Sequence, residues 1–223
     1  MSNISLFVDI GNTAVKWLFD DKYHSVLIPD FTLDLLPKTD QVFVSCVGDK
    51  SLLSGLNGAV FVKSSAQFQS FKSAYDVPQN LGVDRFLTMI GAMHLYPKKN
   101  IFLIDAGSAL TFDLLLKSGE HQGGLIMPGL GKLRNSFDQF SSDDRRITLN
   151  KLANNTQEAW ETGTAEMLMG VVNHQIEQQL NEQGDLKIIL TGGDAKMIAY
   201  RLSHQVNINS HLVLDGLALY AQA

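Results

Sequence analysis

The chain of 223 residues contains a single cysteine, Cys46. One thiol excludes an internal disulfide and any metal site built from several cysteines, which agrees with a reducing compartment. The apolar neighbours Val44 and Val47 predict a buried strand position for Cys46 rather than a catalytic role.

Long apolar runs and concentrated positive charge are also missing. No stretch approaches the roughly 18 uninterrupted apolar residues of a membrane span, and no basic region precedes an apolar core and a small-residue cleavage site at the N-terminus. The net charge is −5 and the sequence pI is about 5.6. The only local basic clusters are Lys98-Lys99 and Arg145-Arg146. These features predict a cytoplasmic protein that binds neither nucleic acid nor a membrane.

The composition is that of a globular protein, with 45% hydrophobic and 18% charged residues. The length suits one large domain or two small ones. Strand and helix patterns alternate, which favours an α/β fold with mixed sheets and helices on their faces. A domain boundary is expected near residues 96–100, separating residues 1–98 from residues 99–223.

The stretch Leu6–Thr13 predicts a buried strand that runs into a carboxylate and then turns at once. Asp9 stands at the strand end, Gly11 lets the backbone approach an anion, and Thr13 offers a hydroxyl. Lys16 follows on the return strand and supplies a point charge for the same phosphate. This corner suits a metal-bound phosphate, and the alternative is an ordinary β-turn after a strand.

A similar pattern recurs in the second half of the chain. Residues Ile101–Asp113 again give an apolar strand, an Asp-x-Gly-Ser turn containing Asp105 and Ser108, and a return strand. The repetition predicts two similar domains that face each other across a cleft. A third turn, Thr191–Asp194, follows another strand near the C-terminus.

Several helices are expected around these turns. One begins near Asp84, and another spans residues 130–140. Thr156 is a plausible N-cap for one or two long helices interrupted at Gly163. The last helix, residues 213–223, is apolar enough to pack on the second domain.

In this order, the three turns resemble the phosphate-1, phosphate-2 and adenosine motifs of the sugar kinase, actin and Hsp70 superfamily. The resemblance sharpens at Tyr75–Arg85, which contains a Gly-x-Asp-Arg motif, and at Gly123–Gly129. Asn155-Thr156, followed by Ala159 and Gly163, matches a further element. Together these motifs resemble type III pantothenate kinase.

This resemblance implies two ribonuclease H-like (actin-like ATPase) domains with mixed five-stranded sheets and a homodimer. It also implies ATP-dependent phosphorylation of the primary hydroxyl of pantothenate, the entry step of coenzyme A synthesis. The implied cofactors are ATP, a divalent metal such as Mg²⁺, and K⁺ or NH₄⁺.

The resemblance also implies roles for individual residues. Asp84 matches the base that accepts the substrate proton, Asp105 the monovalent-cation carboxylate, and Asp9 a contact to Mg²⁺ through ATP. Positions matching the ATP phosphate site are Asp9, Ile10, Gly11, Asn12, Thr13, Ala14, Val15, Lys16 and Ser108. Positions matching the pantothenate site are Tyr75, Gly82, Val83, Asp84, Arg85 and Thr156.

The residues alone leave alternatives open. Asp84 and Arg85 are also explained as an acid at a helix N-terminus beside a surface arginine. A regulatory or accessory protein on the same fold, or a kinase of another small alcohol, would share the three turns. Ser108 stands where the family more often has threonine, and the chain is shorter than many relatives. These departures bear on substrate affinity more than on reaction type.

Overall fold

The computed structural model describes residues 5–149 and 151–223, and the chain divides into two compact units. The first unit comprises the chain up to Pro97 together with Ser118–His121 and His211–Ala223. The second unit comprises Lys98–Lys117 and Gln122–Ser210. The division expected from the sequence, 1–98 and 99–223, differs from this grouping at Lys98, which belongs to the second unit, and in the two later segments that return to the first unit.

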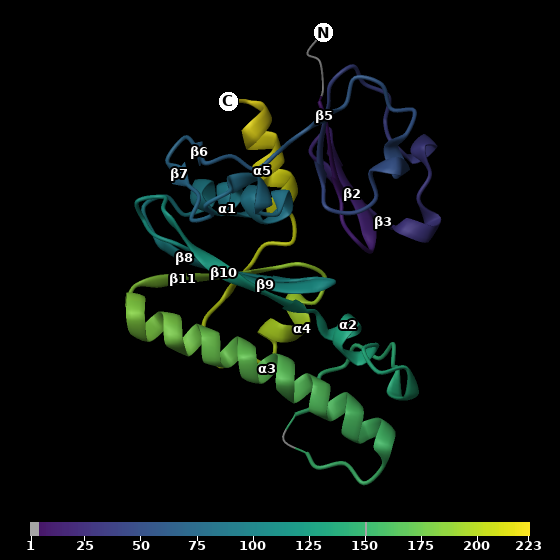
Figure 1. Ribbon diagram of the computed structural model, residues 1–223, viewed down its shortest axis with the longest axis vertical. Helices are drawn as coiled ribbons and strands as arrows, with labels where there is room; N and C mark the ends of the chain where they lie inside the picture. The colour runs from purple at the N-terminus through teal and green to yellow at the C-terminus, as the bar shows by residue number, and fades with distance from the viewer. Residues whose placement is uncertain (1–4, 150) are drawn as a thin grey trace. The chain divides into compact units, whose positions relative to one another are not determined.

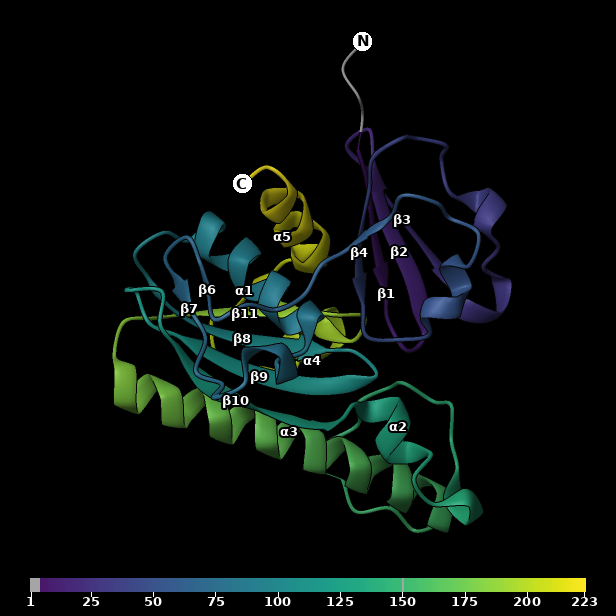
Figure 2. The same cartoon turned by 45° about the horizontal axis from the view of Figure 1, so that its top comes forward.

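The first unit is built on a five-stranded sheet with the strand order β3-β2-β1-β4-β5 (Figures 1 and 2). Strand β1 is antiparallel to β2 and parallel to β4, so the sheet is mixed. A separate two-stranded sheet contains β6 and β7. The strands are β1 (Leu6–Ile10), β2 (Ala14–Phe19), β3 (Lys22–Leu27), β4 (Val42–Cys46), β5 (Val60–Phe61), β6 (Gln67–Phe68) and β7 (Phe71–Lys72).

One face of this sheet packs against irregular chain, and the other packs against two helices. Leu6, Val8 and Ile10 of β1 are fully buried in an apolar cluster that includes Phe31, Leu36 and Leu53. These partners come from the segments around the short 3₁₀ helices Ile28–Asp30, Leu33–Leu35 and Lys50–Leu53. Because side chains alternate along a strand, Phe7 and Asp9 point to the opposite face.

The helices α1 (Val83–Leu95) and α5 (Leu212–Ala221) lie side by side in both views (Figures 1 and 2). Two glycines permit this close contact: a Cβ on Gly216 would lie 1.9 Å from the Leu87 carbonyl oxygen, and one on Gly91 2.8 Å from that of Leu212. The expectation that the last helix packs on the second domain is therefore wrong. Its apolar pattern indicates burial, but the two glycines select α1 as its partner.

The second unit repeats the strand order of the first, with a five-stranded sheet ordered β10-β9-β8-β11-β12. Strand β8 is antiparallel to β9 and parallel to β11. The long helix α3 runs along one face of this sheet (Figures 1 and 2), where Leu168, Val172 and Ile176 join the apolar core. The elements are β8 (Asn100–Ala106), β9 (Ala109–Leu115), β10 (His121–Pro128), α2 (Leu130–Arg134), α3 (Thr156–Gln183), β11 (Leu186–Thr191), α4 (Ala195–Ala199) and β12 (Asn207–Ile208).

Two helix predictions need correction. The helix expected over residues 130–140 ends at Arg134, and a 3₁₀ turn follows at Asp138–Phe140. Arg134 is buried, and its guanidinium donates to the carbonyl oxygens of Asp144, Arg146 and Glu161. These contacts tie the end of α2 to later parts of the chain.

The second correction concerns α3, a single helix of 28 residues without a break at Gly163. Its buried apolar stripe outweighs the roughly 1 kcal/mol that a glycine costs inside a helix. The N-cap is Asn155, whose side chain accepts from the Glu158 amide, and Thr156 is the first helical residue.

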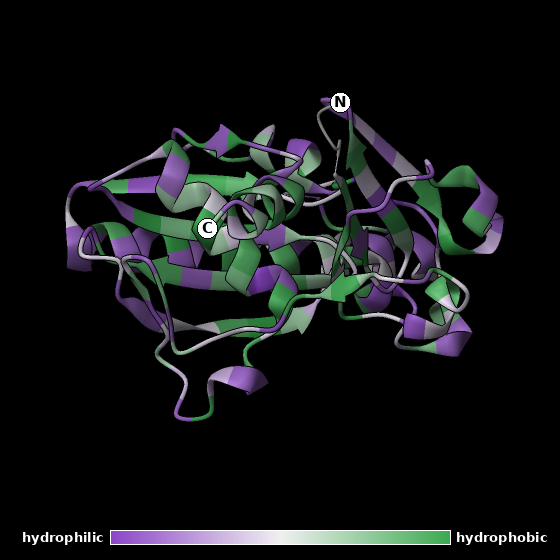
Figure 3. Cartoon of the chain, turned by 90° about the horizontal axis from the view of Figure 1, so that it is seen from above, coloured by the Kyte–Doolittle hydropathy of each residue, from purple (hydrophilic) through white to green (hydrophobic). Residues whose placement is uncertain are grey.

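Both units thus have mixed five-stranded sheets flanked by helices, which confirms the predicted α/β class. Hydrophobic residues are prominent along the strands, and many connecting turns are hydrophilic (Figure 3). Within the described part of the chain, none of the helices has the length and hydrophobicity of a membrane-spanning segment.

Candidate functional site

Asp9 lies at the centre of a polar row across the first sheet. In the strand register Asp9 is opposite Lys16 on β2 and Ser45 on β4. Residues in register share one face, so a carboxylate, an ammonium group and a hydroxyl lie together there. The Ser45 hydroxyl donates to Asp9 Oδ1 at 2.9 Å, and both residues are buried.

Burial raises the pKa of the Asp9 carboxyl above its usual value. Loss of water contact raises the pKa of Asp9 from 3.8 to about 6, although the Ser45 hydrogen bond and the Lys16 charge act in the opposite direction. The charge of Asp84 adds a smaller upward contribution, so the two carboxylates are electrostatically coupled within this unit. A buried anion of this kind favours a bound cation, which suits a divalent metal.

The loop after β1 is held from two sides. The Gly11 amide donates to the Ala14 carbonyl oxygen at 3.1 Å, and Asn12 and Thr13 are exposed at its tip. The amides of Val47 and Gly48 both donate to the Ile10 carbonyl oxygen at 3.1 Å. The turn after β4 therefore buttresses the predicted phosphate loop.

Gly48 is a site residue that the sequence reasoning missed. A Cβ at this position would lie 2.2 Å from the Gly11 carbonyl oxygen, so only glycine allows the two turns to touch. In the sequence, Gly48 is only a single glycine after a β-branched strand. No sequence pattern links it to the loop that contains Gly11, 37 positions earlier.

We expect Gly48→Ala to raise the KM for the predicted substrate ATP by about tenfold, because the added methyl must displace the Gly11 backbone and disturb the predicted phosphate loop. Steady-state kinetics with varied MgATP measure this effect. Gly170→Ala is the matched control, since Gly170 lies in α3 with open space around its Cβ position. An unchanged KM in Gly48→Ala would contradict the assigned contact.

Asp84 and Arg85 occupy the first turn of α1. The Asp84 Oδ1 atom accepts from the Arg85 amide at 2.8 Å. A Cβ on Gly82 would lie 2.6 Å from this oxygen, so a larger residue at position 82 would push the Asp84 carboxylate out of this position. Val83 is buried and anchors the turn. The half-buried Asp84 carboxylate thus has a fixed position at a helix N-terminus.

Arg85 is 5% exposed and contacts Tyr75. Its Nη1 atom donates to the Tyr75 hydroxyl at 2.8 Å, and the guanidinium carbon lies 5.7 Å from the centre of the tyrosine ring. The reading of Arg85 as a surface arginine is therefore wrong. Near-complete burial of a guanidinium beside a tyrosine fits a site for an anionic group.

The second unit contains the counterpart of the Asp9 row. Asp105 on β8 is in register with Thr111 on β9 and Thr191 on β11. A threonine therefore occupies the place that Lys16 has in the first unit. This all-oxygen row suits a cation better than a phosphate.

The predicted second phosphate loop is packed as tightly as the predicted first one. The Gly129 amide donates to the Ser108 carbonyl oxygen at 3.0 Å, and a Cβ on Gly129 would lie 2.0 Å from the Gly107 carbonyl oxygen. Gly192 has a φ of +91°, and its Cβ would meet Asp105 Oδ1 at 2.4 Å. Gly129 and Gly192 therefore allow their backbones to lie close against the loop that contains Asp105. Turn geometry alone does not account for these two glycines.

The third turn ends at Asp194, which is 8% exposed. Burial raises the pKa of its carboxyl, against the opposing charges of Arg145 and Arg134. Arg145 Nη2 lies 3.4 Å from Asp194 Oδ1. A hollow of about 540 Å³ in the same unit is lined by Asp144, Arg145, Arg146, Ile147, Met197, Tyr200 and Arg201.

The predicted site residues are divided between the two units, and Thr156 lies apart at the start of α3. Asp9, Lys16, Asp84, Arg85 and Tyr75 belong to the first unit. Asp105 and Ser108 lie together in the second unit. Thr156 is exposed at the start of α3, at the end of the helix that extends past its own sheet (Figures 1 and 2).

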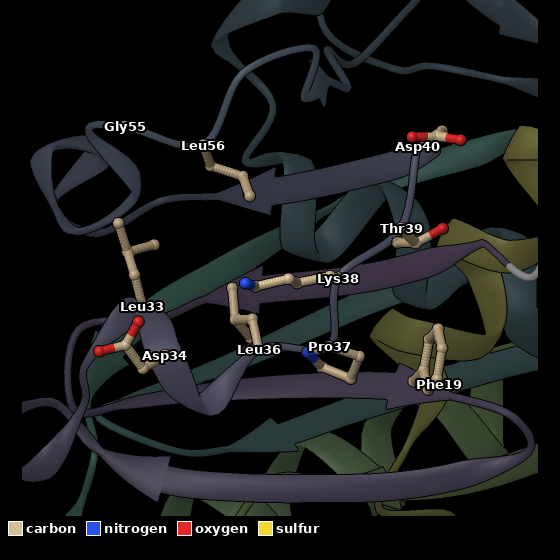
Figure 4. Close-up of a pocket in the computed structure, with 10 residues that line it drawn as sticks. All are labelled: Phe19, Leu33, Asp34, Leu36, Pro37, Lys38, Thr39, Asp40, Gly55 and Leu56. Atoms are coloured by element: carbon tan, nitrogen blue, oxygen red, sulfur yellow. The ribbon is translucent and has the colours of Figure 1, made fainter.

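A larger hollow of about 740 Å³ lies elsewhere on the first unit (Figure 4). Its walls come from the segment between β3 and β4, the chain after Leu53, and the end of β2. None of the predicted site residues lines it. The lining residues are Phe19, Leu33, Asp34, Leu36, Pro37, Lys38, Thr39, Asp40, Gly55 and Leu56.

No group of three or more His, Cys, Asp or Glu side chains within residues 5–149 and 151–223 has a metal-binding arrangement.

Comparisons with known proteins add an independent line of evidence. A family model described as type III pantothenate kinase matches residues 49–178. A type III pantothenate kinase of Colwellia psychrerythraea (strain 34H) is 36% identical, over 97% of this chain and 99% of that protein.

Solved structures extend the comparison to the fold. A Campylobacter jejuni protein described as a Baf family transcriptional activator has a TM-score of 0.66 at 23% identity and covers 97% of each chain. The activator of 2-hydroxyisocaproyl-CoA dehydratase from Clostridium difficile, solved with bound ADPNP, has a TM-score of 0.51 at 11% identity, over 98% of this chain and 94% of that one. At these identities the two structures support the fold alone, and that fold is the predicted actin-like ATPase class.

Proposed function

The chain belongs to the type III pantothenate kinase family, and on this basis we propose that it transfers the γ-phosphoryl group of ATP to the primary hydroxyl of pantothenate. This reaction is the first step of coenzyme A synthesis. The observation that carries the proposal is the family match, because it spans the Gly-x-Asp-Arg motif as well as the second phosphate loop.

We assign the ATP phosphates to the loop after β1. Its amides and the Lys16 ammonium neutralise phosphate oxygens, and phosphoryl transfer depends mainly on such positioning and charge stabilisation. Asp9 would hold Mg²⁺ together with the phosphates, and the ion would supply charge neutralisation there. The buried carboxylate, fixed by Ser45 and with its pKa raised to about 6, supports this role.

We assign the acceptance of the substrate proton to Asp84. An alcohol is far from ionised at neutral pH, so a nearby carboxylate helps as the new bond to phosphorus forms. The bond from the Arg85 amide orients the Asp84 carboxylate. Arg85 and Tyr75 form one polar unit through their 2.8 Å hydrogen bond, which supports binding of the pantothenate carboxylate there.

The second unit supplies the remaining proposed contacts. Asp105, with the two threonines in its row, supports binding of K⁺ or NH₄⁺, and Ser108 supports a contact to ATP. The turn that ends at Asp194 supports placement of the nucleoside end of ATP.

We also propose a homodimer in which Thr156 serves the pantothenate site of the partner subunit. The exposed position of Thr156 at the start of α3 supports this arrangement. A monomeric variant that keeps full pantothenate binding would contradict it.

The proposed activity predicts ADP release that depends on pantothenate and is faster in potassium than in sodium. A coupled assay with MgATP, run with and without pantothenate in each salt, measures both dependences. ADP release that ignores pantothenate, from folded protein that binds ATP, would instead favour another acceptor alcohol or a regulatory role.

A further inference from the structure

The segment Ser118–His121 belongs to the first unit, although the strands that flank it, β9 and most of β10, belong to the second. The Lys72 amide donates to the Gly119 carbonyl oxygen at 3.0 Å, and Lys72 forms a parallel bridge with Glu120. Gly119 has a φ of +91°, and a Cβ there would lie 2.1 Å from the Ser70 carbonyl oxygen. The tip of this hairpin is therefore seated directly on the backbone of the β6–β7 hairpin.

This seating places His121 in an aromatic cluster. The His121 side chain is 3% exposed. Its ring is nearly parallel to that of Tyr75, at 14° and 6.0 Å between centroids, and to that of Phe71, at 25° and 6.3 Å. Phe71 in turn meets Phe86 of α1 edge to face, with 5.3 Å between centroids. The imidazole is thus packed between the α1 core and the tyrosine.

Tyr75 needs such support because of where it lies. It is half-buried in an irregular segment between β7 and α1, and its neighbours Asp76 and Val77 are exposed. Its side chain stacks on His121 and interacts with Arg85. A tyrosine ring held on one side by a flat, buried imidazole presents its hydroxyl to Arg85 in one orientation.

We propose that His121 is a positioning residue for the pantothenate site: its ring fixes Tyr75, and Tyr75 fixes the Arg85 guanidinium that binds the substrate anion. The inference rests on the proposed function of Tyr75 and Arg85. It assigns a role to the β9–β10 hairpin tip, and it predicts that the flat face of the His121 ring matters more than its nitrogens.

The test compares His121→Leu with His121→Phe. Leucine fills similar space without a flat face, whereas phenylalanine keeps the ring and removes both nitrogens. We expect Leu to raise the KM for pantothenate by about 3- to 10-fold, the range that loss of one aromatic pair gives. The KM for ATP should stay within about twofold, and Phe should restore the pantothenate KM to near the native value.

His24→Leu is the matched control, because His24 stacks on Trp17 at 5.1 Å in the same unit but is exposed and outside the proposed site. A native pantothenate KM in His121→Leu, or equal impairment in the Leu and Phe variants, would overturn the inference. So would parallel rises in the KM values for both substrates. Pantothenate-dependent activity of the native enzyme tests the proposed function separately, so the two failures are distinguishable.

Discussion

Asp84→Asn is expected to lower kcat by about 10²- to 10⁴-fold, the usual contribution of a positioned general base. The amide keeps an oxygen that can accept the Arg85 backbone bond, so the first turn of α1 stays in place. The KM for ATP should remain near native, because Asp84 is not assigned to the phosphate loop. Steady-state kinetics with each substrate varied separate these effects.

Asp76→Asn is the matched control for this variant. Asp76 is an exposed acid in the same unit, eight positions earlier, and its replacement removes the same formal charge. We expect native kinetics from it. If Asp84→Asn kept more than a tenth of the native kcat, another group would have to accept the proton.

Asp9→Asn is expected to reduce kcat/KM for MgATP by roughly 10²- to 10³-fold, because the variant loses the carboxylate assigned to the metal. At the same time we expect the protein to become more stable at neutral pH. Native Asp9 is ionised there although it is buried, and the neutral amide removes that cost while still accepting from Ser45.

The size and pH dependence of this gain follow from the pKa of Asp9. The folded value of about 6 lies above the unfolded value of 3.8, so protonation stabilises the native protein as the pH falls through 6 toward 4. The advantage of Asp9→Asn should thus be about 3 kcal/mol above pH 7 and vanish below pH 4. Denaturant unfolding of both proteins at pH 8 and pH 3.5 measures it, and a variant less stable at pH 8 would contradict the assigned burial penalty.

The two strand–turn corners, at Asp9 and at Asp105, could be predicted from the sequence because the residues that specify each corner are neighbours in the chain. An apolar run into Asp-x-Gly specifies both the strand and its abrupt end, and the structure places β1 and β8 there. The repeated pattern also indicated the duplicated sheet, since each copy carries its own return strand. The catalytic and binding roles of these residues remain predictions.

Features that depend on pairing across the fold could not be read in this way. Ser45 and Gly48 join the Asp9 corner only through the parallel pairing of β1 with β4. The partner of α5 depends on Gly91 and Gly216, which are 125 positions apart. The position of His121 depends on the tip of the β9–β10 hairpin, which packs on the β6–β7 hairpin.

The central claim is transfer of a phosphoryl group to pantothenate, and identification of the product tests it most directly. The purified protein would be incubated with MgATP and pantothenate in potassium, and the mixture analysed by mass spectrometry and ³¹P NMR. The account predicts a phosphomonoester on the primary hydroxyl of pantothenate, formed in equal amount to ADP and strongly reduced with Asp84→Asn. Unchanged pantothenate together with ADP and inorganic phosphate would contradict it.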